Sequence, residues 1–167
     1  MIILAIDPGT TQSAYVVYQD KDVLGAGLIP NEQLSEWIGT SQIFSVLGDG
    51  HHEQPMKMYI EMVASYGMPV GKTVFETCVW IGRFIEQWGG DWEYMYRKDV
   101  KMYLCNSTRA KDSNIRQALI DRYGGSKAAA IGVKAAQGPL YGFKADMWAA
   151  LAVAVTAGFR ENMTPPF

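Results

Sequence analysis

The first thirty residues alternate short apolar runs with turn-forming residues, a pattern typical of β-strands joined by tight connections. The apolar run at residues 2–6 is rich in β-branched side chains and leads into the turn-forming sequence Asp-Pro-Gly-Thr-Thr at residues 7–11. Further runs cover residues 13–20 and 22–30, with a turn at residues 19–22 between them. Three strands with such short connections are predicted to form an antiparallel meander.

The middle of the chain combines helical and strand-like patterns. Asn31 is predicted to cap a short helix over residues 31–37. The apolar segment MKMYIEMV at residues 56–63 is predicted to be a strand that ends near Glu61. Residues 72–88 then repeat apolar side chains at helical spacing around more than one face. Such a helix is expected to pack on two sides.

A fifth strand and two more helices complete the pattern. Large side chains alternate along residues 91–97, a polar and basic helix is predicted over residues 109–125, and an alanine-rich helix over residues 144–159. This order predicts an α/β fold with a five-stranded mixed sheet, whose first three strands form an antiparallel meander, and helices on both faces. The connectivity matches that of the ribonuclease H-like fold.

Length and composition limit the class of protein. A chain of 167 residues suits one domain, and we expect residues 1–167 to form it. No run of about 18 apolar residues is present, and the first residues lack the basic segment of a signal peptide. Cys78 and Cys105 are too few for a disulfide framework and lack the CxxC spacing of zinc sites. These features predict a cytoplasmic protein with reduced thiols and no membrane partner.

Three carboxylates stand where predicted elements end or begin. Asp7 and Glu61 follow apolar strand residues, and Asp146 lies at the start of the last helix. If the three converge, their mutual repulsion favours divalent cations, and Mg²⁺ is suited to a site of oxygen ligands. Two such ions would hold the attacking and leaving oxygens of a phosphodiester. The same residues are also consistent with a turn former, a solvated strand end and a helix-start acid.

The net charge of −2 conceals a separation along the chain. Residues 1–60 hold two basic and seven acidic side chains, whereas residues 97–134 hold nine basic and three acidic ones. A segment of that density is a candidate phosphate-binding face. It is also compatible with a solvated helix in which Asp112 and Arg116 form an ordinary i,i+4 pair.

Four segments, in order, resemble the motifs of RuvC-like Holliday junction resolvases, most closely the versions carried by bacteriophages. LAIDPGTTQSAYVV at residues 4–17 resembles the first motif, and YIEMV at residues 59–63, followed by a long helix, the second. RKDVKMYLCNSTRAKDSNIRQAL at residues 97–119 is similar to the stretch with junction-binding basic residues. KADMWAALAVAVTA at residues 144–157 resembles the last helix.

The resemblance implies metal-dependent, paired nicking of four-way DNA junctions by a homodimer, with two Mg²⁺ per site, or Mn²⁺ as a substitute. The carried-over metal ligands and catalytic residues are Asp7, Glu61 and Asp146. Basic residues of the third segment would bind DNA, with Lys101 and Lys111 nearest the cleaved strand. The DNA-binding candidates are Arg97, Lys98, Lys101, Arg109, Lys111 and, by stacking on a base, Tyr66. The cell would be a bacterium or a phage-infected host.

One position departs from the family pattern. Ala149 stands where the family often has a fourth acidic residue, so another group such as Glu76 is a candidate contributor. Two alternatives to the resolvase remain open. One is a junction-binding protein without cleavage, and the other is a nuclease of the same fold that acts on RNA or on other branched DNA.

Paired nicks predict a two-fold dimer, and helix Lys72–Trp88 is the expected interface because it is apolar on more than one side. No nucleotide cofactor is expected. Gly67 lies four residues before Gly71, whereas a P-loop needs five. The ATPases with a similar Asp-Pro-Gly-Thr-Thr loop need two related domains.

Overall fold

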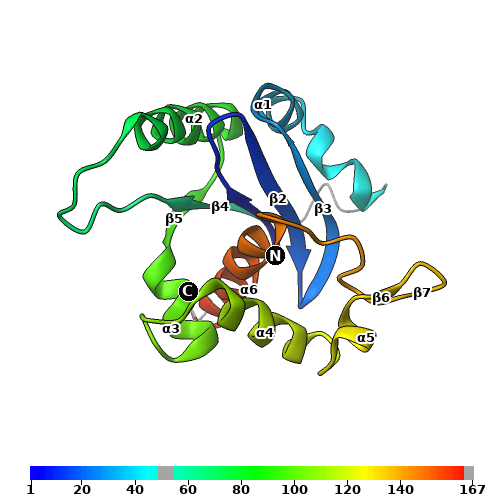
Figure 1. Cartoon of the computed structure of the whole chain (residues 1–167). Helices are drawn as coiled ribbons and strands as arrows, with labels where there is room; N and C mark the ends of the chain where they lie inside the picture. Colours follow the sequence, from blue (N-terminus) through cyan, green and yellow to red (C-terminus); the bar gives the residue numbers. More distant parts are fainter. Residues whose placement is uncertain (49–54, 164–167) are drawn as a thin grey trace.

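The computed structural model describes residues 1–48 and 55–163, and five strands there form one sheet (Figure 1). Across the sheet the order is β3-β2-β1-β4-β5. The first three strands pair antiparallel, whereas β4 pairs parallel with β1 and β5 parallel with β4. The predicted mixed sheet with its meander is confirmed. The strands are β1 (Ile2–Asp7), β2 (Gln12–Gln19), β3 (Asp22–Pro30), β4 (Met56–Met62) and β5 (Trp92–Tyr96).

Helices cover both faces of the sheet, as predicted (Figure 1). The helices are α1 (Asn31–Gly39), α2 (Lys72–Trp88), α3 (Arg97–Cys105), α4 (Asp112–Arg122), α5 (Lys127–Ala130) and α6 (Met147–Met163). A 3₁₀ helix, η1 (Gln42–Leu47), and a small hairpin, β6 (Gly132–Val133) with β7 (Ala136–Gln137), complete the described elements. None of the helices in these residues is long and apolar enough to cross a membrane.

The alternation of side chains along β1 divides the core into two layers. Ile2, Leu4 and Ile6 pack on one face, with α1, α2 and η1. Ile3 and Ala5 pack on the other face, with α3, α4 and α6. Ala150, Ala152, Ala154 and Ala157 of α6 are fully buried, and their small side chains let this helix lie close to β1 and β2. The N-terminal end of α6 therefore lies next to the sheet.

Several elements differ from the sequence prediction. Residues 97–105 form α3, which the apolar pattern did not reveal because Val100 is the only fully buried side chain in it. The basic helix begins at Asp112 and not at residue 109, and the last helix spans Met147–Met163 and not residues 144–159. Element ends depend on capping and tertiary contacts, which periodicity does not report.

The prediction that Asn31 caps α1 is wrong. Pro30 occupies the cap position, and no side chain there bonds to the helix backbone. Asn31 is instead fully buried, where its Nδ2 donates to Gly9 O at 2.9 Å and its Oδ1 accepts from Ser13 Oγ at 2.6 Å. Gly9 N in turn donates to Ser13 Oγ at 3.0 Å. The asparagine therefore fixes the turn that follows β1.

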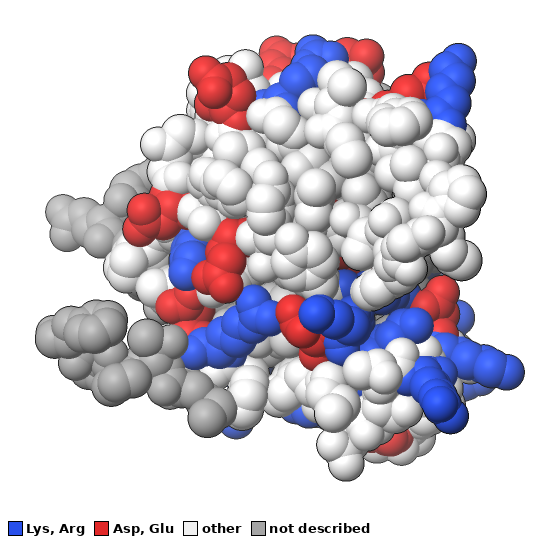
Figure 2. Space-filling model, turned by 90° about the vertical axis from the view of Figure 1, so that its left-hand side faces the viewer, with Lys and Arg blue, Asp and Glu red and all other residues white. Residues whose placement is uncertain are grey.

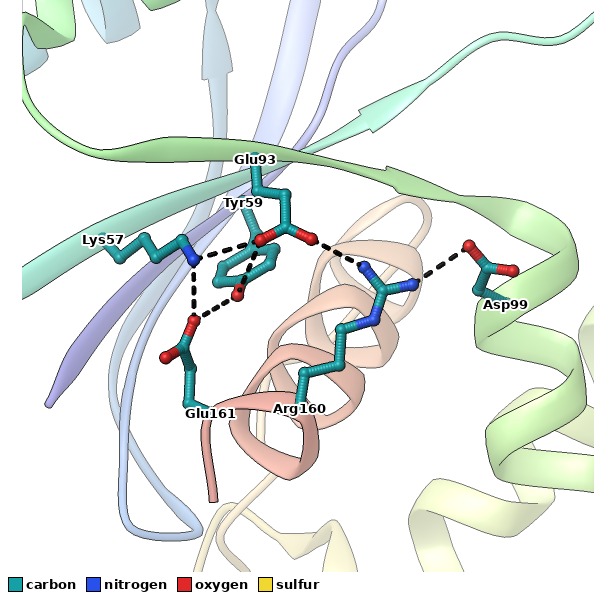
Figure 3. A network of polar contacts seen from close by, with 6 residues as sticks. All are labelled: Lys57, Tyr59, Glu93, Asp99, Arg160 and Glu161. Carbon is teal, nitrogen blue, oxygen red and sulfur yellow. Dashed lines mark hydrogen bonds and ion pairs between the residues drawn. The ribbon is translucent and has the colours of Figure 1, made fainter. Parts of the chain in front are cut away.

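A network of six polar residues joins the end of α6 to β4, β5 and α3 (Figure 3). Lys57 Nζ lies 3.0 Å from Glu93 Oε2 and 2.9 Å from Glu161 Oε1. Arg160 lies 3.1 Å from Glu93 Oε1 through Nη1 and 3.0 Å from Asp99 Oδ2 through Nη2. The network therefore fixes the first turn of α3 against the sheet. Its members are Lys57, Tyr59, Glu93, Asp99, Arg160 and Glu161.

We expect Arg160→Met to lower the free energy of unfolding by about 1 kcal/mol, because it keeps the aliphatic stem and removes both ion pairs. The pairs are partly solvated, which keeps the loss small. Urea unfolding measures the change. Lys72→Met is the matched control: it removes the exposed i,i+4 pair with Glu76, at 3.4 Å, and should cost at most about 0.5 kcal/mol. Equal losses in the two variants would contradict a role for the network.

Candidate active site

Three polar residues stand at the carboxyl ends of the three parallel strands. Asp7 ends β1, Glu61 lies near the end of β4, and Arg97 follows β5 directly. Ile6 pairs with Ile60, so Asp7 and Glu61 are in register on neighbouring strands. Because the carboxyl ends of parallel strands meet at one edge, the three residues come together there.

The face on which the two carboxylates lie follows from strand alternation. Ala5 and Tyr59, each two residues earlier, are buried against α6. Asp7 and Glu61 therefore point to the face that α6 covers. Asp146 directly precedes α6, and its carbonyl accepts the Ala150 N–H at 3.0 Å. The three predicted carboxylates thus converge on one cleft.

The cleft has a volume of about 250 Å³. Helix α4 adds a fourth acidic residue, Asp112, together with Arg116, whose guanidinium lies 4.5 Å from the ring centre of Trp148. The lining residues are Asp7, Glu61, Arg97, Asp112, Ile115, Arg116, Ala145, Asp146, Trp148 and Ala149.

Local backbone structure supports two of the carboxylates. The bonds of Asn31 and Ser13 hold the turn that begins at Asp7. On the other side of the cleft, Ala145 has φ +44°, in the left-handed region that alanine rarely adopts. Such a conformation persists only where surrounding packing imposes it, and it sets the position of the adjacent Asp146.

The electrostatics of the cleft favour a cation. Burial raises the pKa of Asp7 to about 8, with further contributions from Glu61 and Asp146, and Arg97 opposes the rise. Burial also raises the pKa of Glu61, again against the effect of Arg97. Positive charge in the cleft would therefore stabilise both carboxylates in their ionised form.

Two of the lining residues carry buried polar atoms without a hydrogen-bond partner. These atoms are Glu61 Oε2 and Trp148 Nε1, and among the described residues Tyr123 has the third such atom. Buried polar groups in proteins are nearly always paired, so an orphaned atom commonly marks a missing ion, water or substrate. Two of the three unpaired buried atoms among the described residues lie in the cleft, which supports a role of the cleft in binding an ion or a substrate.

The donor set fits a hard divalent cation, because it consists of carboxylate oxygens and includes the orphaned Glu61 Oε2. The side chains as they stand are not arranged as a ligand cluster: within residues 1–48 and 55–163 no three Asp, Glu, His or Cys groups form one. Arg97 Nη1 lies 3.5 Å from Glu61 Oε2 and takes part of that space.

The predicted DNA-binding residues fall into two groups. Arg97 lies in the cleft, where it pairs with Glu61 and Asp112. Of the other basic residues, Lys98 and Lys101 lie on α3, and Arg109 and Lys111 lie in the segment between α3 and α4. Figure 2 shows Lys and Arg gathered over the lower part of the molecule, where these helices lie. The side chains of Lys98, Arg109 and Lys111 are exposed, and that of Lys101 is half-buried.

Tyr66 lies in the loop between β4 and α2, and 67% of its surface is exposed. Glu76 pairs with Lys72 on α2 and does not line the cleft. Ala149 does line it, and the further acidic residue in the lining is Asp112 and not Glu76. Asp112 pairs with Arg97 and not with Arg116, the i,i+4 partner that its helical spacing suggests.

A larger groove, of about 860 Å³, lies near the other end of α6. Tyr18, Tyr103 and Phe159 line it, and Asp22 is its one acidic residue among the described residues. Of these two cavities, as lined by the described residues, only the smaller holds several carboxylates, so the chemistry is assigned there.

Known proteins resemble this chain in structure. Thermus thermophilus RuvC superimposes with a TM-score of 0.66 at 18% identity, covering 98% of this chain and 96% of that one. T. thermophilus RuvC in complex with a Holliday junction substrate gives a TM-score of 0.61 at 19% identity, with the same coverage. The predicted ribonuclease H-like fold of the RuvC type is thereby confirmed. No protein-family model and no curated protein sequence matches the chain.

Metal-free protein should lose stability as pH rises. The folded chain keeps a proton on Asp7 up to pH about 8, whereas an unfolded chain releases it near pH 3.8. The loss of folding free energy that this difference causes is therefore absent below pH 3.8 and complete above pH 8. We expect Asp7→Asn to reduce this dependence to the smaller part that the raised pKa of Glu61 contributes, and to raise the free energy of unfolding at pH 8 by a few kcal/mol. Thermal unfolding in chelator between pH 5 and 8 measures it. Asp121→Asn, at an exposed position of α4, should leave the pH dependence unchanged.

Proposed function

We propose that this chain is a metal-dependent endonuclease that resolves four-way DNA junctions by paired nicks. The observation that carries the proposal is the convergence of Asp7, Glu61 and Asp146 on one cleft at the ends of parallel strands. The junction-bound RuvC structure of the same fold supports the choice of substrate. Such an enzyme would act in the cytoplasm of a bacterial or phage-infected cell, in recombination, repair or phage DNA processing.

The three carboxylates would hold two Mg²⁺ ions, or Mn²⁺ in their place. Bound divalent ions supply a nucleophilic hydroxide and stabilise charge on the departing oxygen. Asp7 and Glu61 are fixed by the sheet, and Asp146 by the backbone at the start of α6. Placing ligands on such rigid elements is what phosphoryl transfer requires, because its barrier is lowered chiefly by positioning and electrostatics.

The basic surface over α3 and α4 would bind the phosphates of the junction arms (Figure 2). It borders the cleft, because Asp112 and Arg116 of α4 belong to the lining. Tyr66 is exposed, and an aromatic side chain in that state can stack on an unpaired base without sequence preference.

Cleavage should be selective for branched DNA. Labelled four-way junction, linear duplex and RNA–DNA hybrid are incubated with Mg²⁺ and wild-type protein, Asp7→Asn or the control Asp121→Asn. We expect symmetric nicks in the junction alone, reduced by about 100-fold or more in Asp7→Asn, because a metal ligand is lost. Binding without nicks would instead indicate a silent junction-binding protein. Cleavage of the hybrid would indicate a nuclease with another substrate.

Lys101→Gln and Lys111→Gln should each weaken junction binding and reduce its salt dependence. A lysine that contacts a phosphate releases about one counterion, so the slope of log affinity against log salt should become shallower by roughly one. Junction titrations at several salt concentrations measure it. Lys21→Gln, in the β2–β3 turn, is the control. An unchanged slope in both test variants would exclude these contacts.

A homodimer would supply two symmetric active sites, and α2 is the proposed interface. Phe75 and Val79 lie one turn apart on its outer face and are 62% and 61% exposed. Figure 2 shows a broad surface without charged residues on the side where α2 and the preceding loop lie. Sedimentation should show a dimer that Phe75→Ser with Val79→Ser converts to a monomer. A wild-type monomer at micromolar concentration would contradict this interface.

A further inference from the structure

Arg97 is the cation that contacts the carboxylates of the cleft directly. Its Nη1 lies 3.5 Å from Glu61 Oε2, and its Nη2 donates to Asp112 Oδ1. Glu61 Oε2 is buried and accepts no hydrogen bond. The guanidinium is therefore the charged group that stabilises this oxygen in the structure.

The place of Arg97 in the fold makes these contacts necessary. Arg97 is the first residue of α3 and follows β5 without a connecting loop. A positive charge at a helix N-terminus is electrostatically unfavourable, so nearby carboxylates must compensate it. Asp99, in the same turn, is fixed by Arg160 in the polar network (Figure 3). The helix start cannot easily carry Arg97 away from Glu61.

A divalent ion and this guanidinium would compete for the same oxygen. Both are cations, and at a few ångströms their repulsion in a half-buried site is strong. Glu61 is mostly buried, whereas Asp112 is exposed at the rim of the cleft. A rotation of the Arg97 side chain alone can therefore break its ion pair with Glu61 and leave its ion pair with Asp112 in place.

We propose that Arg97 is the resident countercation of the cleft: it holds Glu61 in the absence of metal, competes with divalent ions for that carboxylate, and is retained by Asp112 when Glu61 is released. This inference rests on the proposed metal-dependent function. It makes Arg97 a positioning residue that sets the metal concentration at which the site fills, and it removes Arg97 from the set of simple phosphate contacts.

Calorimetric titration of the DNA-free full chain with Mn²⁺ and Mg²⁺ tests the proposal without reference to activity. We expect Arg97→Gln to raise the metal affinity about 5- to 150-fold, the usual range for coupling between two sites. Arg116→Gln is the matched control, because Arg116 lines the same cleft but packs on Trp148. It should raise the affinity no more than about twofold, through long-range charge alone.

Arg97→Lys provides a second variant if Arg97→Gln fails to fold. Lysine keeps the charge but lacks the fork that reaches two carboxylates, so the affinity should rise by an intermediate amount. Equal affinities in wild type, Arg97→Gln and Arg97→Lys would overturn the inference and leave the proposed function intact. If neither wild type nor any variant binds metal at millimolar concentration, both the inference about Arg97 and the proposed metal-dependent function are overturned.

The role of Asp112 is tested by a double-mutant cycle. In wild type, Asp112→Asn should lower the metal affinity, because Arg97 then depends on Glu61 alone. In the Arg97→Gln background the same change should have little effect. An equal decrease in both backgrounds would mean that Asp112 acts only through its charge and would overturn its assignment as the retaining partner.

Discussion

Three parallel strands end at one edge of the sheet, and the rest of the site depends on this constraint. In the antiparallel meander alone, no neighbouring strand would end beside Asp7 at its carboxyl end. The parallel additions of β4 and β5 place Glu61 and Arg97 beside it. Helix α6 lies on the same face and brings Asp146, because its buried alanines allow a close approach to β1 and β2. The cleft therefore follows from strand direction and from small side chains.

The fold could be predicted from the sequence because its signals are local and periodic. The apolar runs of β1, β2 and β4 and the helical spacing of α2 identify their elements directly. Asp7 and Glu61 were predictable because each interrupts an apolar strand at its end. Helix α3 was not, because Val100 is its only fully buried side chain and its other apolar residues that pack on the core, such as Tyr103 and Leu104, are only partly buried.

The polar contacts inside the site could not be predicted from the sequence. Arg97 lies in a basic segment, and nothing local distinguishes it from Lys98, yet it contacts Glu61, a residue 36 positions earlier in the chain. Asp112 suggested an i,i+4 pair and instead contacts Arg97. Asn31 suggested a helix cap and instead bonds to Gly9 in the turn after β1 and to Ser13 on β2. In each case a tertiary contact replaced the local partner, and only the arrangement of strands determines which contact forms.

The direct junction of β5 with α3 has a mechanical consequence. Tyr96 ends the strand and Arg97 begins the helix, so no flexible residue separates them. Lys98 and Lys101 are carried by the same short helix. A displacement of α3 as one element would therefore move the two lysines and the backbone of Arg97 together, and it would strain the contact between Asp99 and Arg160. The basic surface of α3 and the carboxylates of the cleft are thus joined through one short helix.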